Sequence, residues 1–170
     1  MVRNLTRRSF VAGAAALVCV VSLAGINSAA AVAQDDPKEP KGRQIFKTRD
    51  GLALGGYDVV AYFNDNRAVK GSTQFRHEWG SAVWLFSTAR NLQLFRRDPG
   101  KYLPEYGGYG AFGITRGAVE DSDPTNFQVI DNKLYLYPSG EHKQMCDSNR
   151  ERNIRSGDLN WDRIRTVINR

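Results

Sequence analysis

The sequence predicts a small α+β domain on the basis of three observations. Two pairs of short apolar and aromatic segments are each separated by two turn-forming residues, which is typical of β-hairpins. Apolar residues at helical spacing mark the C-terminal part, and a glycine- and aromatic-rich stretch before it fits neither period. We therefore predict a single domain with two short β-hairpins, an aromatic Gly-rich loop and C-terminal helices.

The first 33 residues are organised like an export signal. Three arginines precede an apolar stretch: Arg3, Arg7 and Arg8. The segment 6–10 resembles a twin-arginine motif, and Ala31-Val32-Ala33 supplies a cleavage site with small residues. We expect a twin-arginine signal peptide over residues 1–33 and a mature chain that begins at Gln34. The alternative is a retained anchor, but the apolar stretch, about 17 residues long, is at the lower limit for a membrane span.

Removal of the signal defines the working protein, which we expect to be periplasmic or secreted and not bound to a membrane. The signal holds three of the 24 basic residues and none of the 18 acidic ones, so the net charge falls from +6 to +3. No basic stripe interleaved with aromatic residues remains, so nucleic acid is not an expected partner. Cys19 is also lost, which leaves Cys146 as the single thiol in an oxidising compartment.

The mature chain has the length of one domain. Residues 34–49 are rich in charged residues and proline, which predicts a flexible leader, and residues 50–170 form the domain, with folded structure beginning near Ile45 or Gly51. The elements predicted in its first half are a short strand over 59–63, a hairpin over 73–79 and 82–86 about Gly80-Ser81, and a helix from Ser87 or Thr88 to Arg97 that Asp98-Pro99-Gly100 ends.

The second half begins with the irregular stretch. Residues 102–117 contain five glycines and four aromatic residues, which predicts a structured loop whose backbone passes close to aromatic rings or to a ligand. The elements predicted after it are a hairpin over 127–130 and 133–137 about Asp131-Asn132, a helix from Ser139 to about Ile154 that Gly157 stops, and a last helix over 160–168.

A series of motifs runs through residues 50–137: Gly56-Tyr57-Asp58-Val59-Val60-Ala61-Tyr62-Phe63, His77-Glu78-Trp79, Trp84-Leu85-Phe86-Ser87, Phe95, Asp98-Pro99-Gly100-Lys101-Tyr102, Tyr106-Gly107-Gly108-Tyr109 and Asp131-Asn132-Lys133-Leu134-Tyr135-Leu136. In this order they resemble exported bacterial proteins of the YHS-domain family. The resemblance implies a small α+β domain that occurs beside copper-transporting ATPases, in some oxygenase components and as stand-alone exported proteins. It also implies metal binding by cysteines near the aromatic hairpin and the next helix. Those positions hold Ser87, Asn91 and, after the Gly-Gly-aromatic run, Gly110.

Five residues are candidates for ligand binding: Tyr57, Asp58, His77, Tyr106 and Tyr109. The Asp58 carboxylate precedes an apolar run, so we expect it to be nearly buried and to need a partner, either amides of the Gly-rich loop or a ligand. The tyrosines, with Tyr102, either line a pocket or fill the core. His77 is either a ligand or a structural histidine.

His142 and Cys146 are the candidate metal ligands. They lie four residues apart on a predicted helix and therefore share a face, which suits a soft metal or haem iron. Two ligands underfill a metal site, and the surrounding residues are charged, so a solvated helix face is the alternative. Met145 is adjacent and points about 100° away. The cofactor stays unknown. The resemblance implies a metal ion, but the cysteines that it implies as metal ligands are absent from this sequence.

The sequence contains no G-x-S-x-G elbow, no H-E-x-x-H pair and no P-loop. We therefore expect an exported, YHS-like, non-enzymatic binding module for a metal, a small ligand or a periplasmic partner protein. Two alternatives remain open. One is a structural or protein-interaction domain with no ligand, and the other is a redox accessory protein.

Overall fold

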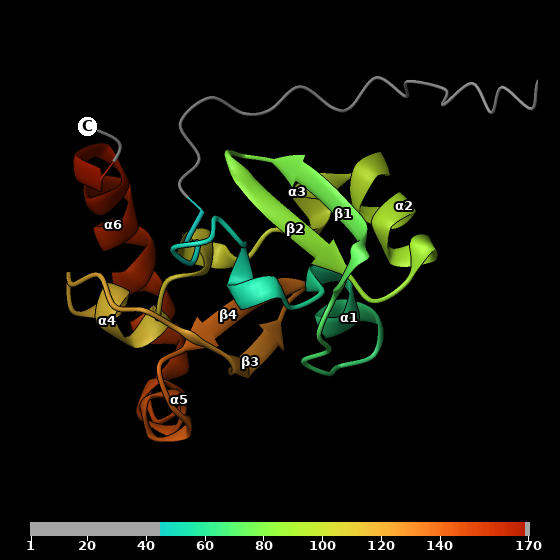
Figure 1. The fold of residues 1–170 in the computed structure, drawn as a ribbon. Helices are drawn as coiled ribbons and strands as arrows, with labels where there is room; N and C mark the ends of the chain where they lie inside the picture. Colours follow the sequence, from blue (N-terminus) through green and yellow to red (C-terminus); the bar gives the residue numbers. More distant parts are fainter. Residues whose placement is uncertain (1–44, 169–170) are drawn as a thin grey trace, which may run out of the picture. The chain divides into compact units, whose positions relative to one another are not determined.

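The computed structural model describes residues 45–168 (Figure 1). It contains two separate two-stranded antiparallel sheets and several helices, which confirms the α+β prediction. The predicted signal peptide and most of the predicted leader lie outside the described residues. Within residues 45–168, no helix is both long enough and apolar enough to cross a membrane.

The first half of the described chain confirms the first hairpin and the helix after it. Its elements are η1 (Leu54–Gly56), α1 (Val59–Asn64), β1 (Ser72–Trp79), β2 (Ala82–Phe86), α2 (Ala89–Arg97) and α3 (Pro99–Tyr102). Strands β1 and β2 pair around Gly80-Ser81, both of which have positive φ. Thr88 caps α2, because its hydroxyl oxygen accepts a hydrogen bond from the backbone amide of Asn91 at 3.1 Å.

The predicted strand over residues 59–63 is wrong, because these residues form helix α1. The Asp58 side chain accepts a hydrogen bond from the Val60 amide, the arrangement of an N-cap. Four successive residues of this short helix are buried: Val59, Val60, Ala61 and Tyr62. An apolar run without polar interruptions has no readable period, so its sequence cannot distinguish a buried helix from a strand.

The second half confirms the second hairpin. Its elements are η2 (Glu105–Gly108), α4 (Ala111–Thr115), β3 (Asp123–Ile130), β4 (Lys133–Tyr137), α5 (Gly140–Asp147) and α6 (Arg150–Ile168). Asp131 and Asn132 both have positive φ, as a two-residue hairpin turn requires. The predicted irregular loop is a compact segment that includes η2 and α4, and Tyr106 within it also has positive φ.

The C-terminal helices differ from the prediction in where they are divided. Ser139 caps α5 as predicted, but α5 already ends at Asp147, and α6 then runs through Gly157 without a stop. Gly157 is buried, and a Cβ atom added there would lie 2.8 Å from Cζ of Tyr106. Gly157 therefore provides space for a tyrosine ring, a use of glycine that helical spacing does not reveal.

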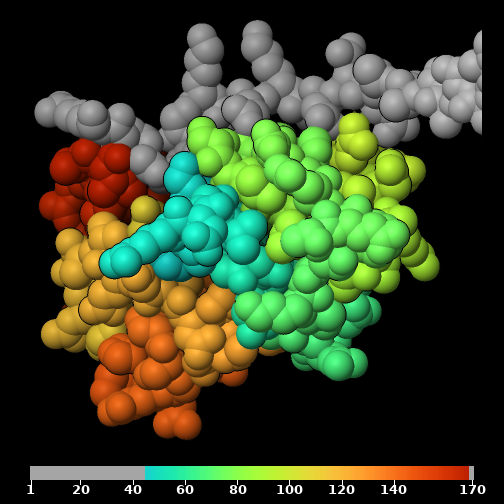
Figure 2. Space-filling view, in the orientation of Figure 1, coloured from blue at the N-terminus to red at the C-terminus, as the bar shows by residue number. Residues whose placement is uncertain are grey.

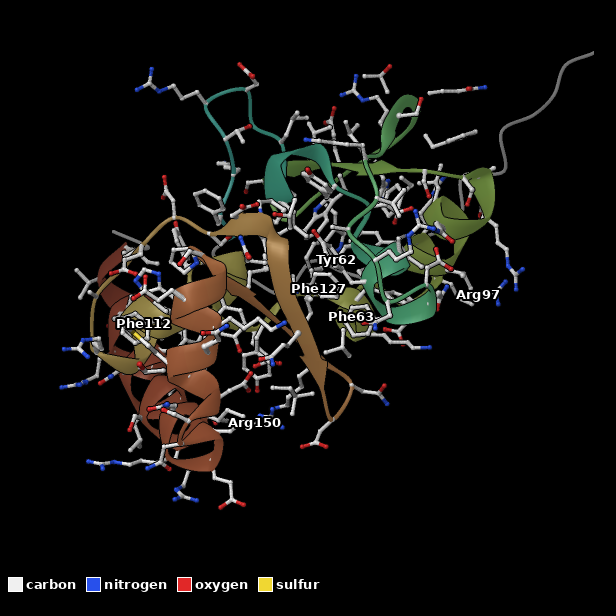
Figure 3. The ribbon with its side chains drawn as sticks, turned by 90° about the horizontal axis from the view of Figure 1, so that it is seen from below. Tyr62, Phe63, Arg97, Phe112, Phe127 and Arg150 are labelled. Atoms are coloured by element: carbon white, nitrogen blue, oxygen red, sulfur yellow. The ribbon has the colours of Figure 1, made fainter. Side chains whose placement is uncertain are left out.

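Strand β4 separates two groups of buried side chains. Alternate residues of a strand point to opposite faces, and here both faces are covered. Leu134 and Leu136 join a cluster built from α1, β2 and α2, whereas Tyr135 and Tyr137 join a second cluster that includes residues of α4 and α6. Tyr62 and Phe127, both labelled in Figure 3, are neighbours in the first cluster. Their rings meet edge to face, with centroids 4.7 Å apart.

The described chain begins inside the predicted leader. Ile45 is buried in the first cluster, and the Phe46 amide donates to the carbonyl oxygen of Gly107 at 2.7 Å. The predicted flexible leader is therefore wrong at residues 45–49, which belong to the fold, and of the two predicted starts of folded structure Ile45 is the correct one.

Candidate functional site

The carboxylate of Asp58 is the most completely buried charged group of the described chain, with none of the residue exposed. It lies where the start of α1 meets the connection from β2 to α2. Its Oδ1 accepts from the Val60 amide at 2.9 Å, and its Oδ2 accepts from the Ser87 amide at 2.8 Å, the Ser87 hydroxyl at 2.6 Å and the Asn91 Nδ2 at 2.7 Å. We call Asp58, Ser87 and Asn91 the Asp58 network.

The partners of Asp58 correct one prediction. Its burial and its need for partners are confirmed, but the expectation that it caps the Gly-rich loop is wrong. The two side-chain donors are Ser87, in the connection before the Thr88 cap of α2, and Asn91, in the first turn of that helix. The resemblance pointed to Ser87 and Asn91 as positions where cysteines were expected, and Ser87 was also a possible start of the helix, but neither residue was predicted to contact Asp58.

The hydrogen bonds of the Asp58 network hold the start of α1 against the start of α2, so the network serves as an internal structural brace. Both oxygens of the Asp58 carboxylate accept hydrogen bonds, and these hydrogen bonds stabilise the carboxylate without a cation. A soft metal needs thiolate, thioether or imidazole ligands, whereas this network offers a hydroxyl, an amide and a carboxylate. The residues present therefore do not fit a thiolate-bound soft metal of the kind that the resemblance implies.

Tyr57 and His77 lie elsewhere around the first cluster. The Tyr57 ring is half-buried and lies 3.9 Å from the Lys70 ammonium, which also donates to the Gly55 carbonyl oxygen. His77 is a residue of β1, opposite Trp84 in the hairpin, and its ring centroid is 6.2 Å from that of Phe95. These contacts favour the structural interpretation of His77.

Tyr106 and Tyr109 belong to the second cluster. The Tyr106 hydroxyl donates to the Asp158 carboxylate at 3.1 Å, and burial, followed by the nearby Asp158 charge, raises the pKa of this phenol. The Tyr109 ring lies against Phe46 and Trp161. Tyr57 and Tyr102 belong to the first cluster, so the structure does not bring the four tyrosines together in one pocket.

His142 and Cys146 both lie on α5 but have different surroundings. His142 Nδ1 is 2.7 Å from the Ser139 hydroxyl, and its ring lies against Phe112, which Figure 3 labels. Cys146 is buried, and that burial raises the pKa of its thiol to about 11, so the solvated-face alternative is wrong at this position. Among residues 45–168, no group of three or more His, Cys, Asp or Glu side chains is arranged to hold a metal ion.

The cavity beside Cys146 is very small. Its walls include Tyr106, Tyr137 and Cys146, and its volume is about 10 Å³. A single water molecule needs about this much space. A small organic ligand therefore does not fit there without displacement of the surrounding side chains.

The surface along α6 carries two open hollows. One, of about 460 Å³, is lined by residues that include Thr115 and Leu159, and the other, of about 370 Å³, by residues that include Val119 and Val167. Both are lined by Asn160 and Arg163, so they are adjoining parts of one surface, which we call the α6 groove. No motif or spacing in the amino-acid sequence predicts this groove.

The Asp58 network and the α6 groove thus differ in kind. The first is enclosed, with its hydrogen-bonding groups engaged inside the protein, and the second is open to solvent and has apolar residues along it. Comparison with protein-family models, curated proteins and solved structures finds no match to this chain.

Proposed function

We propose that this chain is an exported, non-enzymatic binding module of the YHS type that binds a partner through its surface and not through a thiolate metal site. The observation that carries the proposal is the Asp58 network. Ser87 and Asn91 stand where the resemblance places metal-binding cysteines, and both donate hydrogen bonds to one buried carboxylate oxygen.

The geometry of the network supports this relation to the family. The side chains of Ser87 and Asn91 converge on the same atom, Asp58 Oδ2, at 2.6 and 2.7 Å. A carboxylate approached by two side chains, one from just before a helix and one from its first turn, is also an arrangement that can surround a metal when those side chains are thiolates. Replacement of the thiolates by hydrogen-bond donors retains the convergence and turns a metal site into an internal brace.

The export part of the proposal rests on the N-terminal motifs. We expect N-terminal sequencing of the protein recovered from the periplasm or medium to begin at Gln34 or within a few residues of it. An Arg7→Lys, Arg8→Lys variant should accumulate in the cytoplasm, because the paired arginines are the export signal. Recovery of the full-length chain in the membrane fraction would contradict this part alone.

The metal part is tested by restoring the two thiols. A Ser87→Cys, Asn91→Cys variant presents two thiolates and the Asp58 carboxylate, the three-ligand set of an open zinc site. We expect the variant to remove about one equivalent of Zn(II) from a chromophoric chelator, as for a site with three protein ligands. The measurement is a competition titration on the mature protein.

The matched control is a Ser87→Ala, Asn91→Ala variant, which loses the same hydrogen bonds but offers no sulfur. Circular dichroism establishes that both variants fold. A folded cysteine variant that leaves all the Zn(II) with the chelator would show that the resemblance to the family does not extend to this site.

A further inference from the structure

We infer that the α6 groove binds a segment of a separate partner protein in which apolar side chains flank a carboxylate. The inference deepens the proposed function, since it rests on the chain being a binding module, and it names the surface and the chemistry of the partner. Figures 1 and 2 show the surroundings of the groove, where α4 and the chain after it lie beside α6.

One face of α6 carries two exposed apolar residues with an arginine between them, and we call these three residues the stripe. They are Leu159, Arg163 and Val167, which lie at intervals of four residues along one helical face. Leu159 is 72% exposed and Val167 is 68% exposed. Val119, which is 43% exposed, lines the same groove from the chain after α4.

The stripe is additional to the face by which α6 joins the core. Ile154, Trp161 and Ile164 already pack against the second cluster. Single exposed apolar residues are ordinary, but three of the four large apolar residues that are exposed in residues 45–168 line this one groove. The fourth is Met145, on α5. A helix with apolar residues on a second face has a surface suited to a partner.

The charge of the groove indicates what the partner carries. Arg163 is the only charged residue among those that line the two hollows. Its guanidinium donates to the Asn160 side-chain oxygen at 2.5 Å, whereas Arg155 and Arg165 on the same helix form ion pairs with Glu151 and Asp162. A guanidinium with remaining donors between two apolar side chains is complementary to a carboxylate flanked by apolar side chains.

The composition of this chain argues against its own N-terminal segments as the occupant. Residues 34–44 contain acidic residues but no aliphatic or aromatic side chain apart from proline. Residues 1–33 contain apolar side chains but no acidic residue. Neither segment combines the two features that the groove requires, so the occupant is a separate protein.

The test uses the mature protein, Gln34 to Arg170, and a random dodecapeptide library displayed on phage. Selection should enrich peptides that carry Asp or Glu between apolar residues. Synthetic peptides of the enriched sequence should bind about tenfold more weakly to Leu159→Gln and to Val167→Gln. Both residues are highly exposed, so these variants should keep the melting temperature of the parent protein.

Charge reversal tests the role of Arg163. An Arg163→Glu variant should no longer bind the acidic peptides. It should instead bind peptides in which lysine replaces the acidic residue. The matched controls are Met145→Gln, an equivalent apolar change outside the groove, and Arg152→Glu, an equivalent charge reversal elsewhere on α6. Both controls should bind the acidic peptides as the parent does.

Three outcomes would overturn the inference. The first is enrichment of no peptides, or of peptides without the acidic and apolar combination, and the second is binding that the groove variants do not weaken. The third is concentration-dependent dimerisation that Leu159→Gln abolishes, which would make a second copy of this chain the occupant. The zinc result for the cysteine variant does not affect any of these outcomes, so the two proposals fail separately.

Discussion

An Asp58→Ala variant is expected to lose about 3 kcal/mol of unfolding free energy, the cost of removing a charged acceptor from several buried donors. The substitution leaves the Ser87 amide and the Asn91 side chain without the acceptor that both share. It also removes the N-cap of α1, which bonds to the Val60 amide. For a domain of this size, the melting temperature should fall on the order of 10 °C.

Thermal and urea unfolding, followed by circular dichroism, measure this loss. Asp98→Ala is the matched control, because Asp98 also caps a helix through its side chain but is exposed, so its removal should cost about 1 kcal/mol. Addition of Asn91→Leu to Asp58→Ala should cost less than the sum of the single changes, since both remove the same hydrogen bond. An unchanged melting curve together with lost partner binding would make Asp58 a binding residue instead.

A Gly157→Ala variant is expected to destabilise the protein by about 2 kcal/mol through overpacking. Alanine normally stabilises a helix interior relative to glycine by about 1 kcal/mol. Here, however, the new methyl group would lie closest to the Tyr106 hydroxyl oxygen and 2.8 Å from Cζ of the same ring. The ring is held by the hydrogen bond of its hydroxyl to Asp158, so it cannot move aside without further loss.

Urea unfolding compares this variant with Gly140→Ala at the start of α5, where an added Cβ would lie 3.6 Å from the nearest atom, an ordinary contact. The control should be neutral or slightly stabilising. Tyr106→Phe combined with Gly157→Ala should recover part of the loss, because the closest atom is then absent. A Gly157→Ala variant more stable than the parent would show that α6 does not approach Tyr106 so closely.

The parts of the fold that were predicted correctly are those specified by local chemistry. The Asp131-Asn132 turn and the Thr88 cap act within a few residues, so the second hairpin and α2 follow from the sequence. Helix α1 and the continuity of α6 were predicted wrongly because both depend on distant residues. Burial on several sides makes α1 helical despite two valines, and Gly157 serves a tyrosine 51 positions earlier in the chain.

The candidate site shows the same division. The burial of Asp58 follows from its place before an apolar run, but Ser87 and Asn91, which donate to its Oδ2, lie 29 and 33 residues later, and no local pattern joins them to Asp58. The α6 groove could not be predicted, because spacing along one helix does not distinguish apolar residues that face the core from those that face solvent. That distinction depends on α4 and the chain after it, which cover only part of α6.

We propose that the Asp58 network occupies the place of the metal site that the resemblance to YHS-domain proteins implies, and that it binds no soft metal itself. Titration of the wild-type mature protein with Cu(I), in competition with a chromophoric chelator, tests this claim most directly. We predict that the chelator keeps the metal, because hydroxyl and amide groups do not replace thiolates for a soft ion. Any weak residual binding should disappear in a His142→Ala, Cys146→Ala variant. One equivalent of Cu(I) held at about nanomolar affinity, and retained when those two residues are replaced, would contradict the claim.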